Sequence, residues 1–181
     1  RYVLKRFIIF GSQYGTAKSY AQKLSQLTDI ECISYDKIKN RLDVESVIYI
    51  GGLYAGGVKG LKTTMKYLPG SADLTVVTVG LADVNDPVNV EKILHSLRSQ
   101  LAHDRYIKTK FFHLRGGINY RNLTLLHRTM MSLLYQTAKK KDPKQLTEED
   151  KVFLDSYNQQ VNFVDFDSLK PICEWIVNGS E

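Results

Sequence analysis

Five short runs rich in β-branched and aromatic residues recur along the 181-residue chain, and stretches with helical spacing separate them. Such runs favour strands, whereas apolar residues every three or four positions favour helices. The alternation predicts a parallel sheet, because each helix carries the chain back to begin the next strand in the same direction. The expected strands are residues 6–10, 30–35, 46–50, 74–79 and 108–114.

The central expected strands are apolar on both faces, which predicts helices on both sides of the sheet. After the third strand, Val58, Leu61, Met65 and Leu68 have helical spacing. The helix after the fourth strand is the best marked, since Asp86 can cap it and Pro87 suits its first turn. Its expected buried face consists of Val90, Ile93, Leu94, Leu97 and Leu101. The predicted fold class is α/β, with a doubly wound five-stranded parallel sheet.

The chain departs from this simple repeat after the fifth strand. A long helix comes first, and a second helix is expected from Thr147, where Thr147 and Asp150 have the spacing of a capping box. An extended piece over residues 161–166 and a closing helix from about Asp167 complete the chain. We predict a single domain over residues 1–181, in which residues 115–160 form a helical insertion.

The loops after the first, third and fourth strands are expected to form the ligand site. In an open parallel sheet, ligands bind beyond the carboxyl ends of the strands, where the strand order reverses. The first loop has small and hydroxyl residues between a strand and a helix N-terminus, a setting that suits a phosphate group. Its candidate residues are Ser12, Gln13, Tyr14, Gly15, Thr16 and Ala17.

The other two loops are expected to hold a flat ligand. Glycines in the third-strand loop allow close approach of the backbone, and Tyr54 could stack on the ligand or cover one edge of it. Backbone groups of the fourth-strand loop could meet a polar edge. The candidates are Leu53, Tyr54, Ala55, Gly56, Gly57, Gly80, Leu81, Ala82 and Asp83. Each loop alone is equally consistent with an ordinary tight turn, and the conjunction of all three favours the site.

The segment FGSQYGTAKSYAQKL resembles the phosphate loop of flavodoxins, usually T-x-T-G-x-T, and the resemblance extends over essentially the whole chain. It implies a flavodoxin-like fold with strand order 2-1-3-4-5 and non-covalent binding of FMN. Ser12, Tyr14 and Gly15 take the first hydroxyl, second hydroxyl and glycine positions. Ala17 lacks the hydroxyl of the last position, so Thr16 would have to compensate, or the phosphate would lose one bond.

The segment FFHLRGGINYRNLTLLHRTMMSLL resembles menaquinone-dependent protoporphyrinogen oxidases and their flavodoxin-domain relatives. The resemblance implies that a group of residues after the fifth strand lines the flavin crevice or the substrate approach; the alternative is a helix-entry turn with the arginine in an ion pair. This group is Arg115, Gly116, Gly117, Asn119 and Tyr120.

The function implied by the resemblance is that of an FMN-dependent oxidoreductase passing electrons from a bulky reduced substrate to a quinone. The alternative is a flavodoxin-type electron carrier between protein partners, without a small-molecule substrate. Gly56, Gly57 and Asp83 would tune the redox potential, with an acidic Asp83 lowering it. A response-regulator receiver is disfavoured, because Gly51 and Gly52 stand where an aspartate is expected.

The net charge of +6 indicates, weakly, an anionic partner. A porphyrin carboxylate, a membrane surface that holds the quinone, and a redox partner protein are the expected partners; nucleic acid is not. The candidate basic contacts are Arg121, Arg128, Lys139, Lys140, Lys141 and Lys144. Lysines at the end of a helix also complement its dipole and are usually solvated, which is the simpler explanation for them.

The remaining residues give little support for metal or disulfide chemistry. Cys32 and Cys173 match no metal-ligand spacing and are expected to be buried free thiols, and the four histidines are scattered. No stretch approaches the roughly 20 apolar residues of a membrane-spanning helix. We therefore expect a cytoplasmic protein, with peripheral membrane contact as an option, and no metal.

Overall fold

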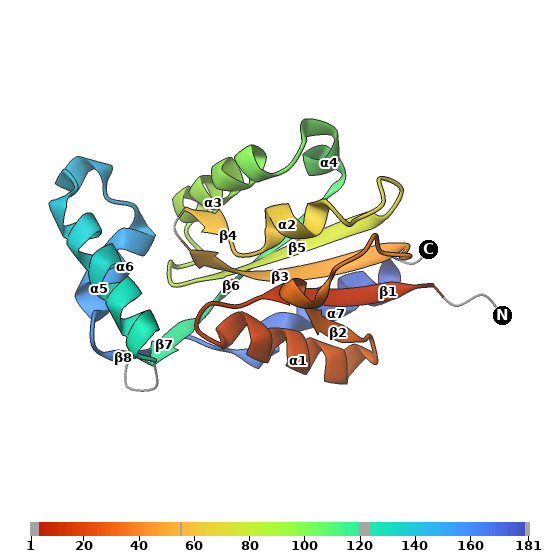
Figure 1. Ribbon diagram of the computed structural model, residues 1–181, viewed down its shortest axis with the longest axis horizontal. Coiled ribbons are helices and arrows are strands. Elements are labelled where there is room, and N and C mark those ends of the chain that lie inside the picture. Colours follow the sequence, from red (N-terminus) through yellow and green to blue (C-terminus); the bar gives the residue numbers. More distant parts are fainter. Residues whose placement is uncertain (1–3, 55, 120–123, 180–181) are drawn as a thin grey trace.

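A parallel sheet lies at the centre of the computed structural model, which describes residues 4–54, 56–119 and 124–179 (Figure 1). Its strands occur in the order β2-β1-β3-β5-β6, which confirms the predicted α/β class and strand order. The strands are β1 (Arg6–Gly11), β2 (Cys32–Ser34), β3 (Ser46–Tyr54), β5 (Asp73–Gly80) and β6 (Lys110–Arg115).

The strand register brings the carboxyl ends of β1, β3 and β5 to one edge of the sheet. Gly11 pairs with Gly51, and Gly52 pairs with Val79. Strand β3 continues to Tyr54 and turns back into the short β4 (Gly57–Val58). The sequence prediction ended this strand at residue 50, because glycines disfavour strands; here neighbouring strands on both sides supply their hydrogen-bond partners.

Helices α1 (Thr16–Thr28) and α7 (Lys170–Asn178) cover one face of the sheet. Tyr20 and Leu24 of α1 are fully buried, as is Ile172 of α7. They pack in one cluster with apolar residues of all the central strands. A 3-10 turn, η4 (Phe166–Leu169), leads into α7, so the closing helix begins close to its predicted start.

The opposite face carries α2 (Leu61–Met65), α3 (Pro87–Gln100) and α4 (His103–Lys108). The Asp86 carboxylate accepts a hydrogen bond from the Val88 amide at 2.9 Å, which confirms the predicted cap. Leu97 of α3 and Leu101, which directly follows this helix, are buried as predicted. The helix expected from Val58 begins only at Leu61, because Val58 belongs to β4. A short 3-10 turn, η1 (Tyr35–Lys37), directly follows β2.

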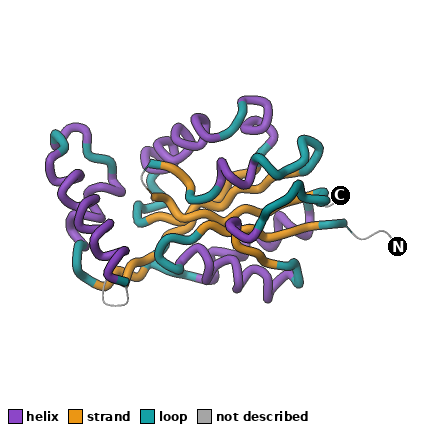
Figure 2. Tube along the Cα trace, viewed as in Figure 1, coloured by secondary structure: helices purple, strands orange, loops and turns teal. Residues whose placement is uncertain are grey.

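The insertion forms a helical hairpin beyond the carboxyl ends of the strands (Figures 1 and 2). Its helices are α5 (Leu125–Lys140) and α6 (Glu148–Ser156), joined by the 3-10 turn η3 (Pro143–Gln145). The predicted capping box is present: the Thr147 hydroxyl and the Asp150 carboxylate each accept the other residue's amide at 3.0 Å. A pair of antiparallel strands, β7 (Gly117–Asn119) and β8 (Gln160–Asn162), closes the hairpin at its base.

Cys32 and Cys173 are free thiols, but both are half-buried rather than buried. Burial raises the pKa of each thiol above its ordinary value. In the described part of the chain, no group of three or more His, Cys, Asp or Glu residues is placed to hold a metal ion. No helix there combines the length and the apolar character that crossing a bilayer requires.

Candidate functional site

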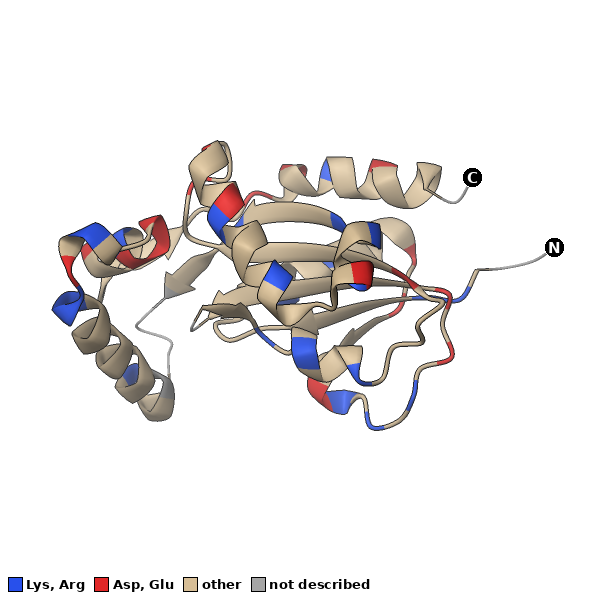
Figure 3. Cartoon of the chain, turned by 90° about the horizontal axis from the view of Figure 1, so that it is seen from above, with Lys and Arg blue, Asp and Glu red and all other residues tan. Residues whose placement is uncertain are grey.

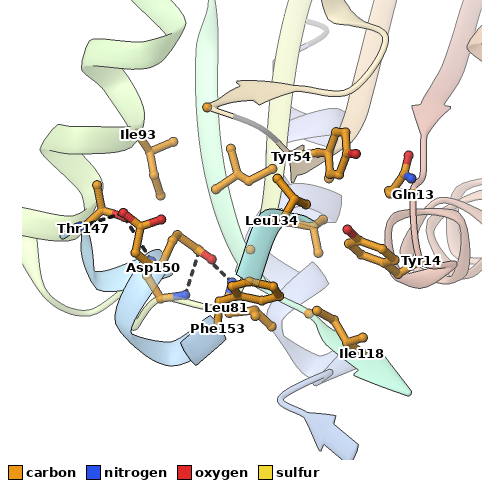
Figure 4. A pocket seen from close by; sticks show the side chains of 18 of the residues that line it. Gln13, Tyr14, Tyr54, Leu81, Ile93, Ile118, Leu134, Thr147, Asp150 and Phe153 are labelled. Atoms are coloured by element: carbon orange, nitrogen blue, oxygen red, sulfur yellow. Dashed lines mark hydrogen bonds between the residues drawn. The ribbon is translucent and has the colours of Figure 1, made fainter. Parts of the chain in front are cut away.

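A cavity of about 530 Å³ opens where the three predicted loops meet the α5–α6 hairpin (Figure 4). Its size is within the range of small-molecule sites. Fourteen of the residues proposed from the sequence to bind the cofactor or to line the approach to it line this cavity: Ser12, Gln13, Tyr14, Thr16, Ala17, Leu53, Tyr54, Gly56, Gly57, Gly80, Leu81, Ala82, Gly116 and Gly117. Ala55 and Tyr120 lie outside the described residues.

The β1–α1 loop has the backbone of an anion site. Gly15 has a φ of 89°, in the left-handed region that favours glycine, and α1 begins directly after it. The Gly15 amide donates to the Ser12 hydroxyl at 3.0 Å. The amides of the first helical turn have no acceptor within the helix, and the helix dipole adds positive potential there. A phosphate placed here would meet several N–H donors.

Thr16 does not supply the hydroxyl that Ala17 lacks. The Thr16 hydroxyl donates to the Gly117 carbonyl at 2.8 Å, and so joins the phosphate loop to β7. Ala17 is buried in the core beside the sheet. Gly116 lies close to the side chains of Val79 and Thr16: a Cβ added to it would stand 2.8 Å from Val79 and 3.0 Å from Thr16. Close packing against Val79 and Thr16 thus accounts for the glycine at residue 116.

Two tyrosines border the cavity beside the phosphate loop. The rings of Tyr14 and Tyr54 approach edge to face, with centroids 6.2 Å apart, and Figure 4 shows both on the same side of the cavity as Gln13. The Lys59 ammonium lies 5.6 Å from the centre of the Tyr54 ring and donates to the Gln13 side chain. Lys59 was not singled out from the sequence, although it follows the glycines of the same loop.

The loop after β5 directs two backbone amides into the cavity. The amides of Leu81 and Ala82 donate to one oxygen, Oε1 of Glu149, at 2.7 and 2.8 Å. On the other side of the loop, the Arg115 guanidinium donates twice to the Leu81 carbonyl, at 2.6 and 3.1 Å. The loop is therefore held by its carbonyl while its N–H groups face the space where a ligand would lie.

Arg115 fits neither of the two roles considered for it. Its guanidinium lies 3.7 Å from the centre of the Phe163 ring and binds a backbone carbonyl, so it neither lines the cavity nor forms a carboxylate ion pair. Asn119 ends β7.

Asp83 was wrongly expected near a ligand ring. Its carboxylate is exposed and accepts the Asn85 amide at 2.9 Å, and its carbonyl accepts from Asn89. This turn leads toward the Asp86 cap and carries the Asp83 side chain out of the cavity.

Three acidic residues of the first turn of α6 line the cavity, Glu148, Glu149 and Asp150, and Glu149 is the one that binds the loop after β5. Burial raises the pKa of the Glu149 carboxyl, while the two amides and Arg115 act in the opposite direction. The sequence predicted the capping box of Thr147 and Asp150, the two residues that flank this position. It gave no sign that this first turn faces the loop after β5.

The hairpin supplies an apolar wall. Ile118 and Met131 are buried against Leu81, and Leu134 and Phe153 pack on the same cluster, as Figure 4 shows in part. Two lysines from different elements, Lys92 and Lys141, also line the cavity. The Lys141 ammonium pairs with Asp150 at 3.0 Å. Arg121 lies outside the described residues.

Comparisons with known proteins identify the family. The model of the flavodoxin domain family matches residues 7–145. The chain belongs to this family. No curated protein matches it. Among solved structures, it is similar to a putative flavoprotein from Bacteroides eggerthii, with 10% identity, coverage of 72% of this chain and 98% of that one, and a TM-score of 0.44.

A second similar structure is a cysteine-to-alanine mutant of flavodoxin from Pseudomonas aeruginosa. Its identity is 18%, the match covers 75% of this chain and 97% of that one, and the TM-score is 0.38.

Proposed function

We propose that this flavodoxin-family chain binds FMN in the cavity and acts as an FMN-dependent oxidoreductase. The observation that carries the proposal is that a single cavity joins the start of α1 to the paired amides of Leu81 and Ala82. The first is suited to a phosphate and the second to the carbonyl oxygen of a ring. Both amides already donate to an oxygen of Glu149, so an oxygen at this position can accept from the two together.

FMN, when bound, would supply the redox chemistry, and the chain would supply position and electrostatics. The amides at the start of α1 would neutralise the phosphate. Tyr14 and Tyr54 would exclude water from one edge of the ring, since both border the cavity beside that loop. The amides of Leu81 and Ala82 would donate to the opposite, polar edge, with Arg115 holding their loop in place.

The cavity continues beyond the three loops, and we propose that this part receives a bulky organic substrate. Leu134 and Phe153 give it an apolar wall, and its charged lining consists of Lys92 and Lys141 together with Glu148, Glu149 and Asp150. The apolar wall suits the rings of a bulky aromatic compound such as a reduced porphyrin, as in quinone-dependent protoporphyrinogen oxidases. The test is anaerobic turnover of protoporphyrinogen with a quinone acceptor. The alternative is an electron carrier between proteins. It predicts no turnover of protoporphyrinogen, and rapid electron transfer between the bound flavin and a reductase.

The exposed side of α5 favours a membrane as the place where the quinone is met. Leu125, Leu126 and Leu133 are exposed, and Lys139 and Lys140 follow on the same helix. Figure 3 shows the hairpin carrying basic as well as acidic residues. Sedimentation with anionic lipid vesicles tests this contact, which a Leu126→Ser, Leu133→Ser double variant is expected to weaken.

FMN binding itself can be tested at Ser12. In Ser12→Asp, a carboxylate would stand beside the phosphate, and repulsion at this range is expected to weaken FMN binding by about tenfold or more. Ser12→Asn is the matched uncharged control: it also loses the hydroxyl, but without the repulsion it should bind FMN more tightly than Ser12→Asp. Flavin fluorescence quenching measures the dissociation constants. Riboflavin, which lacks the phosphate, should bind both variants equally; failure of every protein to bind FMN would defeat the proposal.

A further inference from the structure

The carboxylate of Glu149 occupies a position that a ligand should hold. One of its oxygens accepts both the Leu81 and the Ala82 amide, the only N–H pair that the β5–α3 loop is seen to direct into the cavity among the described residues. The geometry is that of a carbonyl oxygen held between two adjacent amides. An occupant from the protein itself therefore fills the binding subsite for the ring's polar edge.

Two features of the backbone accommodate the contact between Glu149 and the loop after β5. A Cβ at Gly80 would overlap the Glu149 carboxylate, so the absence of a side chain at the end of β5 makes room for it. Glu149 also lies in the first turn of α6, where the reciprocal bonds of Thr147 and Asp150 fix the backbone. Both the helix and the strand end are thus shaped for this contact.

The same contact is poorly compensated. No Lys, Arg or His nitrogen of the described residues lies within 4 Å of the Glu149 carboxylate. Arg115 acts on it from beyond that range, while its guanidinium is bonded to the Leu81 carbonyl. Glu149 is half-buried, so its carboxylate loses part of its solvation without gaining an ion-pair partner, and burial accordingly raises its pKa. Two amide hydrogen bonds offset that loss.

We propose that Glu149 is a displaceable internal ligand: it binds the Leu81 and Ala82 amides in the FMN-free protein and leaves when a ring oxygen takes them. This inference rests on the proposed function. Only a ligand with hydrogen-bond acceptors at that edge can take over both amides, so the contact also selects for ring chemistry. The α6 turn, which carries Glu149, changes its packing against the β5–α3 loop when FMN binds.

The test is FMN affinity, measured by fluorescence quenching, for wild type, Glu149→Gln and Glu149→Ala. Removing the competitor should tighten binding by about tenfold in Glu149→Ala, the equivalent of one or two net hydrogen bonds. Glu149→Gln keeps a weaker, neutral acceptor and should fall between. Asp155→Asn removes the same charge from an exposed position on the same helix and should match wild type.

A second readout does not depend on the measured affinities. In ¹⁵N spectra, the Leu81 and Ala82 amide signals of the FMN-free wild type and Glu149→Ala should differ, because only one retains the carboxylate. With saturating FMN they should coincide, because the ring oxygen holds both amides in either protein. If the two FMN complexes keep the difference seen without FMN, the carboxylate has stayed in place and the inference is wrong.

The outcomes separate this inference from the function on which it rests. Tighter binding by the Glu149 variants, including binding that wild type lacks, supports both. Equal or weaker binding by these variants, with normal binding by wild type, overturns the inference and leaves the FMN site standing. Absence of FMN binding by all four proteins overturns both.

Discussion

The sheet with its covering helices and the α5–α6 hairpin are stabilised in different ways. Apolar side chains on both faces of the sheet are almost completely excluded from solvent, as at Ile8 and Val76. In the hairpin, Met131 is 1% exposed, whereas Leu125 is 82% exposed and Leu133 is 64% exposed. Its one small core cluster includes Leu81, a residue of the cavity loop.

The difference indicates which wall of the cavity can move. The three loops follow β1, β3 and β5, which have paired neighbours and buried faces. The hairpin buries few apolar side chains between its own helices, and these pack against Leu81 of the loop after β5. Regions with few buried apolar contacts open at lower free energy than the core. The hairpin, which carries Glu149, is therefore the wall expected to adjust to a ligand.

The largest expected effect comes from shortening one leucine in each region. Leu97 is completely buried under α3, so Leu97→Ala should lower the free energy of unfolding by about 3 kcal/mol through lost contacts and a cavity. Leu133→Ala, on the exposed side of α5, should change it by about 0.5 kcal/mol or less. Urea denaturation measures both. Equal losses would show that α5 is buried against something in solution.

A smaller effect is expected from removing one helix cap in each region. Asp86→Ala and Thr147→Ala each remove a side chain that accepts an amide of the first helical turn, at a cost of about 1 kcal/mol. For Asp86→Ala the loss should appear in global unfolding. For Thr147→Ala it should appear as faster hydrogen exchange confined to Glu148–Ser156. Spread of that faster exchange to the sheet would contradict the distinction between the regions.

The smallest effect is a pH dependence expected from the sheet alone. His113, on β6, has a ring nitrogen 2.7 Å from the Thr78 hydroxyl, and burial lowers its pKa below the ordinary value of 6.5. The unfolded chain therefore takes up a proton at a pH where the folded protein resists it. Stability is complete above about pH 7 and falls as the pH drops through about 6.5 toward the lowered pKa.

His113→Gln is expected to remove this component. Thermal unfolding of wild type and variant at several pH values between about 7.5 and 5.5 measures it. The difference in unfolding temperature between wild type and variant should narrow toward low pH, or reverse so that the variant is the more stable protein. Parallel pH profiles would show that His113 is protonated equally in the folded and unfolded states.

Local signals in the sequence determined most of the frame. The alternation of strand-like and helix-like segments predicted the sheet, the resemblance to flavodoxins implied its order, and the spacing of Thr147 and Asp150 predicted the start of α6. The position of three unusual loops at strand ends predicted the cavity, because parallel strands bring their carboxyl ends to one edge. These features depend on backbone preferences and on periodicity, which neighbouring residues specify.

Only the tertiary structure decided what fills the site. Glu149 and Leu81 are 68 positions apart, and no local pattern specifies that a carboxylate from one meets the amide of the other. In the same way, packing commits the Thr16 hydroxyl to Gly117, and a turn carries Asp83 out of the cavity. Such pairings arise when separate elements compete for the same space and the same hydrogen-bond donors, and the assembled fold alone settles that competition.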